Sequence, residues 1–228
     1  MLARARRLAL DALFPPQCAL CGQHGTLLCN GCMSDLPRAA GSRCGRCWVP
    51  VARKGLCRHC TESEPVFASI RAACVMDAGA RRLAHMLKYD GLTSLAEPMA
   101  QLMVATTERQ DVDVVVPVPL HGRRERSRGY NQSAELARHI AAMRGVTFDP
   151  RVARRDRDTA PLVKTMSREE RRQIMAEAFA ARRDGVDGMR VLLIDDVVTT
   201  GATLGSCAAA LLDAGARSVH CLTWARAD

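Results

Sequence analysis

The feature that most restricts how this chain can fold is a set of four Cys-x-x-Cys pairs within its first 60 residues. In such a pair the backbone turns so that two thiolates converge on one metal ion, and two pairs complete a tetrahedral zinc site. One pair alone would also fit a redox motif. Four pairs this close together predict two zinc sites, with these ligands: Cys18, Cys21, Cys29, Cys32, Cys44, Cys47, Cys57 and Cys60.

An internal repeat indicates how the cysteines divide. Residues 18–32 and residues 44–60 each begin and end with a Cys-x-x-Cys turn, called a knuckle below, and a short hairpin is expected between the two knuckles. This repeat favours sequential pairing, in which the first four cysteines share one zinc ion and the last four share the other. A cross-braced arrangement is the alternative, because spacing alone does not fix the pairing of ligands. His59 lies inside the last knuckle and is a further candidate ligand, although a histidine there more often faces solvent.

The two zinc ions are expected to be structural. Residues 15–62 contain few large apolar side chains, so this segment cannot fold around a core of its own. A site closed by four thiolates also lacks the open position that catalysis needs. A disulfide framework is the alternative, but it requires an oxidising compartment. Residues 1–14 read as a short amphipathic helix rather than a signal peptide, because Asp11 interrupts the apolar run. We therefore expect a cytoplasmic protein.

The rest of the chain alternates between strand and helix patterns. Strands are expected at 66–76, 112–118, 191–194 and 218–224, and helices at 79–88, 95–107, 131–143 and 204–212. This alternation predicts a parallel sheet with right-handed crossovers. Ligands of such sheets bind beyond the carboxyl ends of the strands, so the chemistry is expected just after Val118 and Ile194. The three unpaired cysteines are expected to pack as small apolar residues: Cys74, Cys207 and Cys221.

The strongest functional signal is the segment 191–204. Four apolar residues enter the sheet, and Asp195 and Asp196 stand at the end of that strand. The residues that open the next helix are Thr199, Thr200, Gly201, Ala202 and Thr203. A helix start offers free N–H groups and a positive dipole end to a phosphate. Because a phosphate repels carboxylates, the two aspartates should face another part of the ligand, and a ribose diol fits that place. An ordinary strand end with a threonine cap would explain one of these residues but not the whole motif.

This motif closely resembles the 5-phosphoribosyl diphosphate signature of type I phosphoribosyltransferases. The resemblance implies that Asp195 and Asp196 contact the ribose hydroxyls and that residues 199–203 hold the 5′-phosphate. Residues 117–132, which include His121, resemble the corresponding loop of the ComF family, and so do residues 87–89 and the position of the cysteine pairs. Members of that family combine a double zinc ribbon with this transferase fold and are linked to DNA uptake in competent bacteria.

The resemblance covers nearly the full chain and implies its architecture. It predicts an α/β fold in which a type I phosphoribosyltransferase-like parallel sheet, flanked by helices, is preceded by a small double zinc ribbon. The expected segments are an N-terminal amphipathic helix at 1–14, the double zinc ribbon at 15–62 and the phosphoribosyltransferase-like domain at 66–228.

The chain carries a net charge of +9, which suits a phosphorylated ligand, nucleic acid or anionic lipid without choosing among them. A basic loop is expected directly after the strand at 112–118, and it contains Arg123, Arg124, Arg126 and Arg128. Guanidinium groups bind phosphate oxygens in bidentate fashion. We therefore expect this loop, together with His121, to face the diphosphate, where negative charge grows as the C1′ bond breaks.

Two later arginine clusters fit a solvated face equally well. They comprise Arg151, Arg154, Arg155, Arg157, Arg168, Arg171 and Arg172. Basic loops could also follow single-stranded DNA, but aromatic residues, on which bases would stack, make up only 4% of the chain. No run of 18 apolar residues occurs, so no membrane span is expected.

The leading interpretation is an enzyme that transfers a phosphoribosyl group with release of diphosphate, using Mg²⁺ held mainly by the ligand. The alternative is a non-catalytic protein that senses this ligand or binds single-stranded DNA or a competence partner. Residues 159–162 and Gln173 depart from the residues that family members often carry in the segment expected to form the catalytic loop. These departures favour the alternative slightly.

Overall fold

The computed structural model describes residues 15–107, 110–156 and 178–227. The predicted N-terminal helix at 1–14 lies outside the described residues. So do residues 159–162, Gln173 and four of the arginines discussed above, namely Arg157, Arg168, Arg171 and Arg172.

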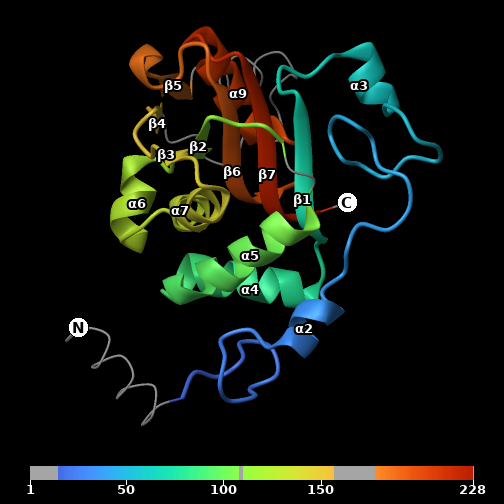
Figure 1. The fold of residues 1–228 in the computed structure, drawn as a ribbon, viewed down its shortest axis with the longest axis vertical. Coiled ribbons are helices and arrows are strands. Elements are labelled where there is room, and N and C mark those ends of the chain that lie inside the picture. Colours follow the sequence, from blue (N-terminus) through green and yellow to red (C-terminus); the bar gives the residue numbers. More distant parts are fainter. Residues whose placement is uncertain (1–14, 108–109, 157–177, 228) are drawn as a thin grey trace, which may run out of the picture.

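The centre of the molecule is a five-stranded parallel sheet with the strand order β1-β7-β6-β2-β3 (Figure 1). The strands are β1 (Ser69–Val75), β2 (Val114–Pro117), β3 (Thr147–Phe148), β6 (Arg190–Val198) and β7 (Ser218–Arg226). The apolar runs predicted to be buried strands lie in the middle of this sheet, because β6 pairs with β2 on one side and with β7 on the other. The predicted α/β architecture is confirmed.

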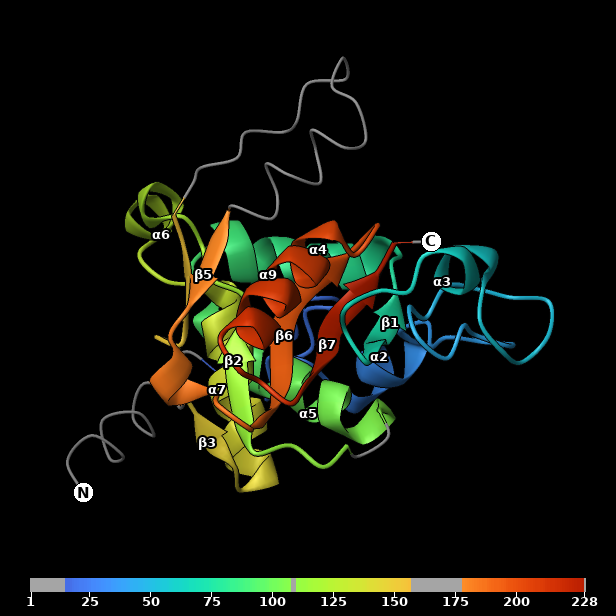
Figure 2. The ribbon, with the colours of Figure 1, turned by 90° about the horizontal axis from the view of Figure 1, so that it is seen from above.

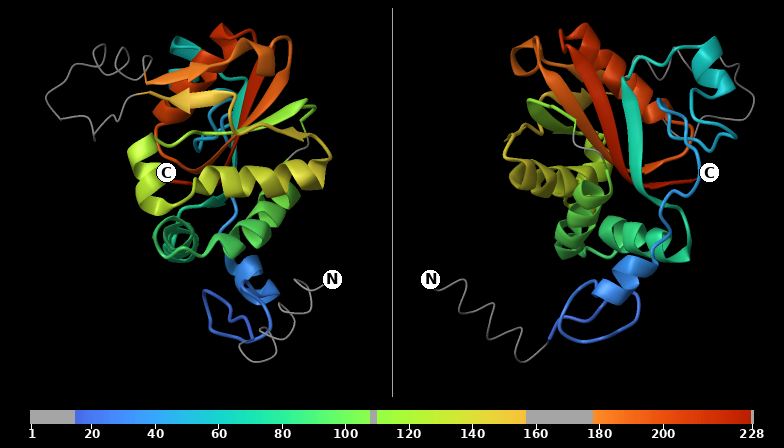
Figure 3. Two further views of the ribbon diagram at one scale, coloured as in Figure 1. Left: turned by 90° about the vertical axis from the view of Figure 1, so that its left-hand side faces the viewer. Right: turned by 45° about the vertical axis from the view of Figure 1, so that its right-hand side comes forward.

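Helices cover both faces of the sheet (Figure 1 and Figure 3). One face packs against α4 (Ala78–Tyr89), α5 (Ala96–Thr106) and α7 (Gln132–Arg144), while the other packs against α9 (Ala202–Asp213). A short 3-10 helix, η1 (Thr93–Leu95), precedes α5. The apolar residues at helical spacing that predicted these helices, such as Leu83, Leu136 and Leu211, are fully buried. Cys74, Cys207 and Cys221 are also buried in the core, as predicted.

A smaller antiparallel hairpin stands at the edge of the domain. It consists of β4 (Ala153–Arg155) and β5 (Phe179–Ala181), and a 3-10 helix, η2 (Arg183–Gly185), follows it. Figure 2 shows β5 beside α9, with which it is in contact. β3, β4 and β5 were not predicted, because strands of only two or three residues are too short to show a pattern in the sequence.

Two predicted boundaries are wrong in ways that matter for the site. The basic segment 123–128, predicted to be a loop, forms the helix α6 (Gly122–Arg128). His121 accepts a hydrogen bond from the Arg123 N–H at its start, and Gly129 ends it in the left-handed conformation, with φ of 84°. The strand predicted at 191–194 continues to Val198, so the two aspartates lie within β6 rather than after it.

The N-terminal part of the chain forms two small units at different places on this domain (Figure 1 and Figure 3). We call residues 18–36 the first zinc unit, which contains α2 (Asn30–Asp35). Its Leu28 and Leu36 belong to the same buried core as the apolar residues of α4 and α5. We call residues 42–62 the second zinc unit; it contains α3 (Arg58–Glu62) and lies beside β1. In the described parts of the chain, no helix has the length and apolar character needed to cross a membrane.

Candidate functional site

The eight paired cysteines form two clusters, and each has the geometry of a zinc site. Cys18, Cys21, Cys29 and Cys32 form one cluster and Cys44, Cys47, Cys57 and Cys60 the other, with sulfur atoms within 4.8 Å of one another in each. In a tetrahedral site with Zn–S bonds of about 2.3 Å, the sulfur atoms lie about 3.8 Å apart. The Sγ atoms of Cys21 and Cys29 are 3.7 Å apart, and those of Cys47 and Cys57 are 3.6 Å apart. The donors therefore fit zinc, and the pairing is sequential, as the repeat predicted.

In each cluster the backbone favours the thiolate form of one cysteine, Cys18 in the first and Cys44 in the second. The Cys29 N–H donates to Cys18 Sγ at 3.4 Å, and the Cys57 N–H donates to Cys44 Sγ at 3.2 Å. Burial raises the pKa of Cys18, but these backbone donors outweigh burial and lower the pKa to about 6. The same balance lowers the pKa of Cys44 to about 6. All the described cysteines are free of disulfides, and His59 is exposed outside the second cluster.

The two predicted ribose-binding carboxylates form a buried pair near the carboxyl end of β6. Asp195 is 8% exposed and Asp196 is 3% exposed. Burial, followed by repulsion from the Asp196 charge, raises the pKa of Asp195 to about 7. Two adjacent buried carboxyl groups are costly for a fold. Such a pair needs hydrogen-bond donors and a nearby cation to remain buried.

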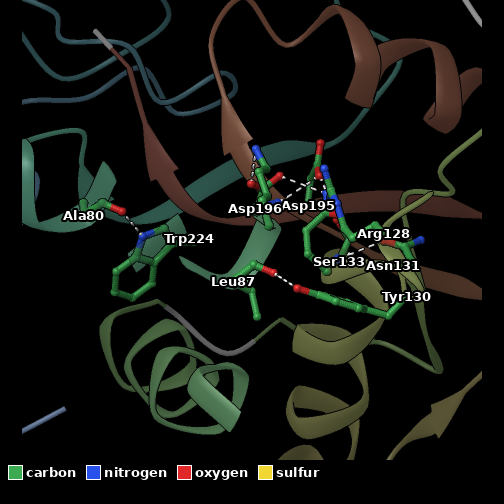
Figure 4. Close-up of polar contacts among 11 residues, drawn as sticks. Ala80, Leu87, Arg128, Tyr130, Asn131, Ser133, Asp195, Asp196 and Trp224 are labelled. Atoms are coloured by element: carbon green, nitrogen blue, oxygen red, sulfur yellow. Dashed lines mark hydrogen bonds and ion pairs between the residues drawn. The ribbon is translucent and has the colours of Figure 1, made fainter. Parts of the chain in front are cut away.

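The start of α7 supplies hydrogen bonds to both carboxyl groups (Figure 4). Ser133 Oγ donates to Asp195 Oδ1 at 2.8 Å, and Gln132 Nε2 lies 3.4 Å from Asp196 Oδ1. Asn131 caps the same helix through the Ser133 N–H and donates its amide to the Val118 carbonyl at 2.9 Å. The segment 131–133 thus fixes the helix start to the end of β2 and aims two side chains at the acid pair.

A lysine from α4 completes the surroundings of the acid pair. Lys88 Nζ forms an ion pair with Asp196 Oδ2. Lys88 lies in the last turn of α4, and the carbonyl of its neighbour Leu87 accepts a hydrogen bond from the Tyr130 hydroxyl (Figure 4). Within the described ranges, Lys88 is the cation that pairs directly with these two carboxyl groups, so the pair keeps negative charge that Lys88 does not compensate when both are ionised.

Of the arginines on α6, Arg128 is joined to the acid pair through Gln132. The Arg128 guanidinium donates to Gln132 Oε1, and the other end of that amide faces Asp196. The guanidinium also lies over the Tyr89 ring, 5.2 Å from its centroid. The other arginines of this helix, Arg123, Arg124 and Arg126, are exposed. His121 is half-buried and acts as the cap of α6, while its backbone bridges to Arg155.

The predicted phosphate loop follows β6 directly. Gly201 has φ of 82°, a left-handed conformation that favours glycine, and it begins α9 without a side-chain cap. The Thr199 and Thr200 side chains are exposed, Ala202 is exposed and Thr203 is half-buried. Thr200 Oγ1 accepts from the Ala202 N–H at 3.3 Å. The loop therefore presents hydroxyl groups and the positive end of a helix to solvent, near the two aspartates on the preceding strand.

The later arginines that the structure describes are mostly engaged within the protein. Arg154 pairs with Asp156 at 2.8 Å, and Arg155 lies over the Phe179 ring. Arg151 is exposed. These contacts agree with a solvated face rather than with a ligand site.

Three residues of this arrangement were not among the predicted site residues: Lys88, Gln132 and Ser133. Lys88 and Gln132 lie inside the two segments, 87–89 and 117–132, that carried the family resemblance. Ser133 follows directly. The family resemblance of these two segments could therefore have pointed to Lys88 and Gln132. Their contacts with the aspartates, however, depend on tertiary packing, which the sequence does not show.

Comparison with known families divides the chain in the same way. Residues 9–61 match the double zinc ribbon domain, and residues 126–227 match the phosphoribosyl transferase domain.

Known proteins resemble the chain over most of its length. It is 31% identical over 217 residues to the DNA utilization protein YhgH of Salmonella typhimurium, an alignment that covers 90% of this chain and 95% of that protein. It is 26% identical to the competence protein ComFC of Bacillus subtilis, with 87% of this chain and 84% of that protein covered. Among solved structures, the allosteric regulatory enzyme of purine biosynthesis aligns with a TM-score of 0.44 and 22% identity, over 61% of this chain and 30% of that chain.

Proposed function

Because this chain belongs to the ComF family, in which a double zinc ribbon precedes a phosphoribosyltransferase domain, we propose that it binds 5-phosphoribosyl diphosphate at Asp195, Asp196 and residues 199–203. The observation that carries this proposal is the buried acid pair on β6, followed within a few residues by the uncapped start of α9. A phosphate and a diol are the two groups that such a site would hold at this spacing.

Each part of the ligand has a matching group. The ribose hydroxyls would donate hydrogen bonds to the two carboxylates, which Ser133 and Gln132 hold in orientation. The 5′-phosphate would accept hydrogen bonds from the N–H groups and hydroxyls of residues 199–203. The diphosphate would lie toward the positive charges nearest the acid pair, Lys88 and Arg128.

Mg²⁺ would accompany the diphosphate. Hard oxygen ligands suit this ion, and the buried carboxylates of Asp195 and Asp196 offer such oxygens at the site, so the described residues fit it. When bound, the ion would neutralise part of the diphosphate charge. The zinc clusters, closed by four thiolates each, would remain structural.

We further propose that the protein is a phosphoribosyltransferase. A nucleophilic atom of the acceptor would bond to C1′ while the bond between C1′ and the diphosphate oxygen breaks, so that diphosphate leaves with the electron pair and the acceptor loses a proton. Asp195 and Asp196 would hold the ribose, while Lys88 and Arg128 would stabilise the leaving group. The catalytic contribution of these residues would be positioning and charge stabilisation.

The names of the relatives favour a second candidate, in which the same ligand site regulates DNA utilization or competence without turnover. Binding of single-stranded DNA or of a competence protein would then be the output. For either function we place the double zinc ribbon at 15–62 and the transferase-like domain at 66–228. We place the protein in the cytoplasm, where reducing conditions keep thiols available to zinc.

The acid pair provides the first test. Replacing both residues, Asp195→Asn with Asp196→Asn, should weaken binding of 5-phosphoribosyl diphosphate by at least about tenfold in calorimetry, because hydrogen bonds to charged groups contribute about 1.5–3 kcal/mol. Asp213→Asn, an exposed acid at the end of α9, is the matched control and should leave affinity unchanged. Unchanged affinity in a folded double variant would contradict the proposed site. Release of diphosphate in the presence of candidate acceptors then separates an enzyme from a sensor.

A further inference from the structure

Cys47 of the zinc ribbon and Thr199 of the phosphate loop, 152 residues apart in sequence, are joined by one buried side chain. Arg226 lies at the end of β7 and is 5% exposed. Its Nη1 donates to the Cys47 carbonyl at 2.8 Å, and its Nη2 donates to the Thr199 carbonyl at 3.2 Å. Cys47 is a ligand of the second cysteine cluster, and Thr199 is the first residue of the phosphate loop. The two ends of one guanidinium therefore hold both.

The backbone of Arg226 is itself fixed by the sheet. It lies opposite Val198 of β6 and Val75 of β1, and its carbonyl accepts from the Met76 N–H at 2.7 Å. The guanidinium is thus a bridge on a rigid support rather than a mobile surface group. A buried charged group of this kind depends on its hydrogen-bond acceptors, since losing one leaves a desolvated donor.

On the zinc side, three successive carbonyls of one knuckle contact the sheet. The Gly45 carbonyl accepts from Arg71 Nη1 at 3.0 Å, and the Arg46 carbonyl accepts from the Ile70 N–H at 2.7 Å. The Cys47 carbonyl accepts from Arg226. The knuckle lies between two ligands of one cluster, Cys44 and Cys47, so the metal that they bind would determine the direction of these carbonyls.

On the loop side, a second contact reaches the same knuckle. A β-carbon placed on Gly201 would lie 3.2 Å from Ile70 Cδ1, so the glycine at the start of α9 sits directly against this side chain. Ile70 is also the residue whose N–H donates to the knuckle. Arg226 and Ile70 therefore place the loop on the surface that the second zinc unit covers.

The first zinc unit has different contacts. Its Leu36 packs near Gly79 of α4, and the Pro37 carbonyl accepts from the Val75 N–H at 2.9 Å. Arg38 bonds the carbonyls of Met33 and Leu36 within that unit. Arg38 therefore binds carbonyls of the first zinc unit, as Arg226 binds a carbonyl of the second. Arg38→Met is for this reason the matched control for Arg226→Met.

From these contacts we infer that Arg226 is a positioning residue that couples the second zinc site to the phosphate loop. Zinc bound by the second cluster keeps the Cys47 carbonyl in place, and that carbonyl fixes the position of the Arg226 guanidinium. The guanidinium in turn holds the Thr199 carbonyl, so that the loop keeps the conformation that accepts a phosphate. The affinity for the phosphate end of the ligand would then depend on metal occupancy of the second cluster. The ligand in this inference rests on the proposed function, whereas the coupling itself does not.

The first test compares Arg226→Met with Arg38→Met in the full-length zinc-loaded protein. Hydrogen exchange of the amides of residues 199–204, measured without ligand, should become faster in Arg226→Met and stay unchanged in Arg38→Met. Ribose 5-phosphate, which carries the phosphate and the diol but no diphosphate, should bind about tenfold more weakly to Arg226→Met. Arg226→Lys keeps the charge but loses the two-pronged guanidinium, so its affinity for ribose 5-phosphate should lie between those of the wild type and Arg226→Met.

The second test asks whether zinc and Arg226 act through one route. Cys57→Ser should reduce the metal content, and in the same protein it should accelerate exchange at 199–204 about as much as Arg226→Met does. Combining the two changes should add little, because coupled residues are non-additive. Unchanged exchange in Arg226→Met, or fully additive effects, would overturn the coupling. If wild-type protein fails to bind ribose 5-phosphate while exchange responds as expected, the proposed ligand is wrong and the coupling stands.

Discussion

Asp195 and Asp196 are buried side by side, and burial changes what each carboxyl group does at neutral pH. The pKa of Asp195 is raised to about 7 by burial and by the Asp196 charge, although Ser133 donates a hydrogen bond to it. Lys88 faces Asp196 from α4, and the Cys207 thiol near Asp195 is neutral because burial raises its pKa. A protonated Asp195 would thus be the resting form below pH 7, and a ligand or cation would favour its ionised form.

This pKa predicts an unusual dependence of stability on pH. Between about pH 4 and 7 the folded chain holds a proton on Asp195 that the unfolded chain releases, so the contribution of this group to stability falls as pH rises through that window. Relative to wild type, Asp195→Asn should gain about 1–3 kcal/mol in free energy of unfolding between pH 4.5 and 7.5. Urea titrations of both proteins at several pH values measure this difference.

Asp113 is a useful comparison, because its pKa is lowered whereas that of Asp195 is raised. Hydrogen bonds from Arg190 lower the pKa of Asp113 to about 2, so its contribution is present above pH 4 and is lost as pH falls toward 2. Asp113→Asn should therefore show a pH-independent difference from wild type between pH 4.5 and 7.5. If Asp195→Asn behaves in the same way, Asp195 is ionised throughout and the acid pair is better compensated than its surroundings indicate.

At the scale of elements, the site depends on how three helices end or begin. Lys88 lies in the last turn of α4, Arg128 in the last turn of α6, and Gln132 and Ser133 in the first turn of α7. Gly129 allows the chain to turn sharply between α6 and α7. The positive side chains and the acid pair are therefore brought together by helix termini, and α4 and α7 are positioned by packing against the sheet.

This arrangement predicts which part of the ligand each charge serves. Arg128→Ala should weaken binding of 5-phosphoribosyl diphosphate by roughly tenfold or more, while ribose 5-phosphate binds nearly as before, because only the former carries the diphosphate. Lys88→Met also removes the ion-pair partner of Asp196, so it should weaken binding of both ligands. Arg128→Lys should restore part of the loss. Arg126→Ala, an exposed arginine on the same helix, is the matched control.

Melting temperatures decide whether these effects are local. Arg128 is half-buried and contacts Gln132 and the Tyr89 ring, so ligand-free Arg128→Ala should lose only the small stability of these two contacts and melt a few degrees or less below wild type. Equal losses for both ligands in Arg128→Ala would assign Arg128 to orienting Asp196 through Gln132 rather than to the diphosphate. Loss of salt-dependent DNA binding with intact ligand affinity would instead assign Arg128 to nucleic acid.

The sequence predicted the strands and helices that carry long apolar patterns and missed what depends on local caps or on tertiary contacts. The run at 191–194 identified the central strand, but Asp195 and Asp196, which continue β6 toward Val198, are poor strand formers, and pairing with β7 keeps this part of the chain extended. The concentration of charge in residues 123–128 predicted a loop, but His121 and Gly129 cap a helix there. Lys88 and Ser133 could not be found from spacing, since they lie 108 and 62 residues before the aspartates that they contact.

At the scale of the whole molecule, the two cysteine clusters lie at separate places, and each holds a different part of the domain. Metal analysis of the purified protein should give two zinc ions per chain, since each cluster supplies four thiolates at tetrahedral spacing. Cys21→Ser should lower the content by about one ion, and so should Cys57→Ser, because the clusters share no ligand. A wild-type stoichiometry near one would contradict the two-site arrangement.

The position of the zinc ribbon also bears on how the sheet avoids self-association. β1 pairs with β7 on one side only, so it is an edge strand. Its other side is occupied by the ribbon, since Ile70 donates to the Arg46 carbonyl and Val75 to the Pro37 carbonyl. An uncovered edge of this kind is a template for pairing between chains and for aggregation. Zinc starvation would therefore threaten this protein first through insolubility, because removing the metal would free the ribbon that shields β1.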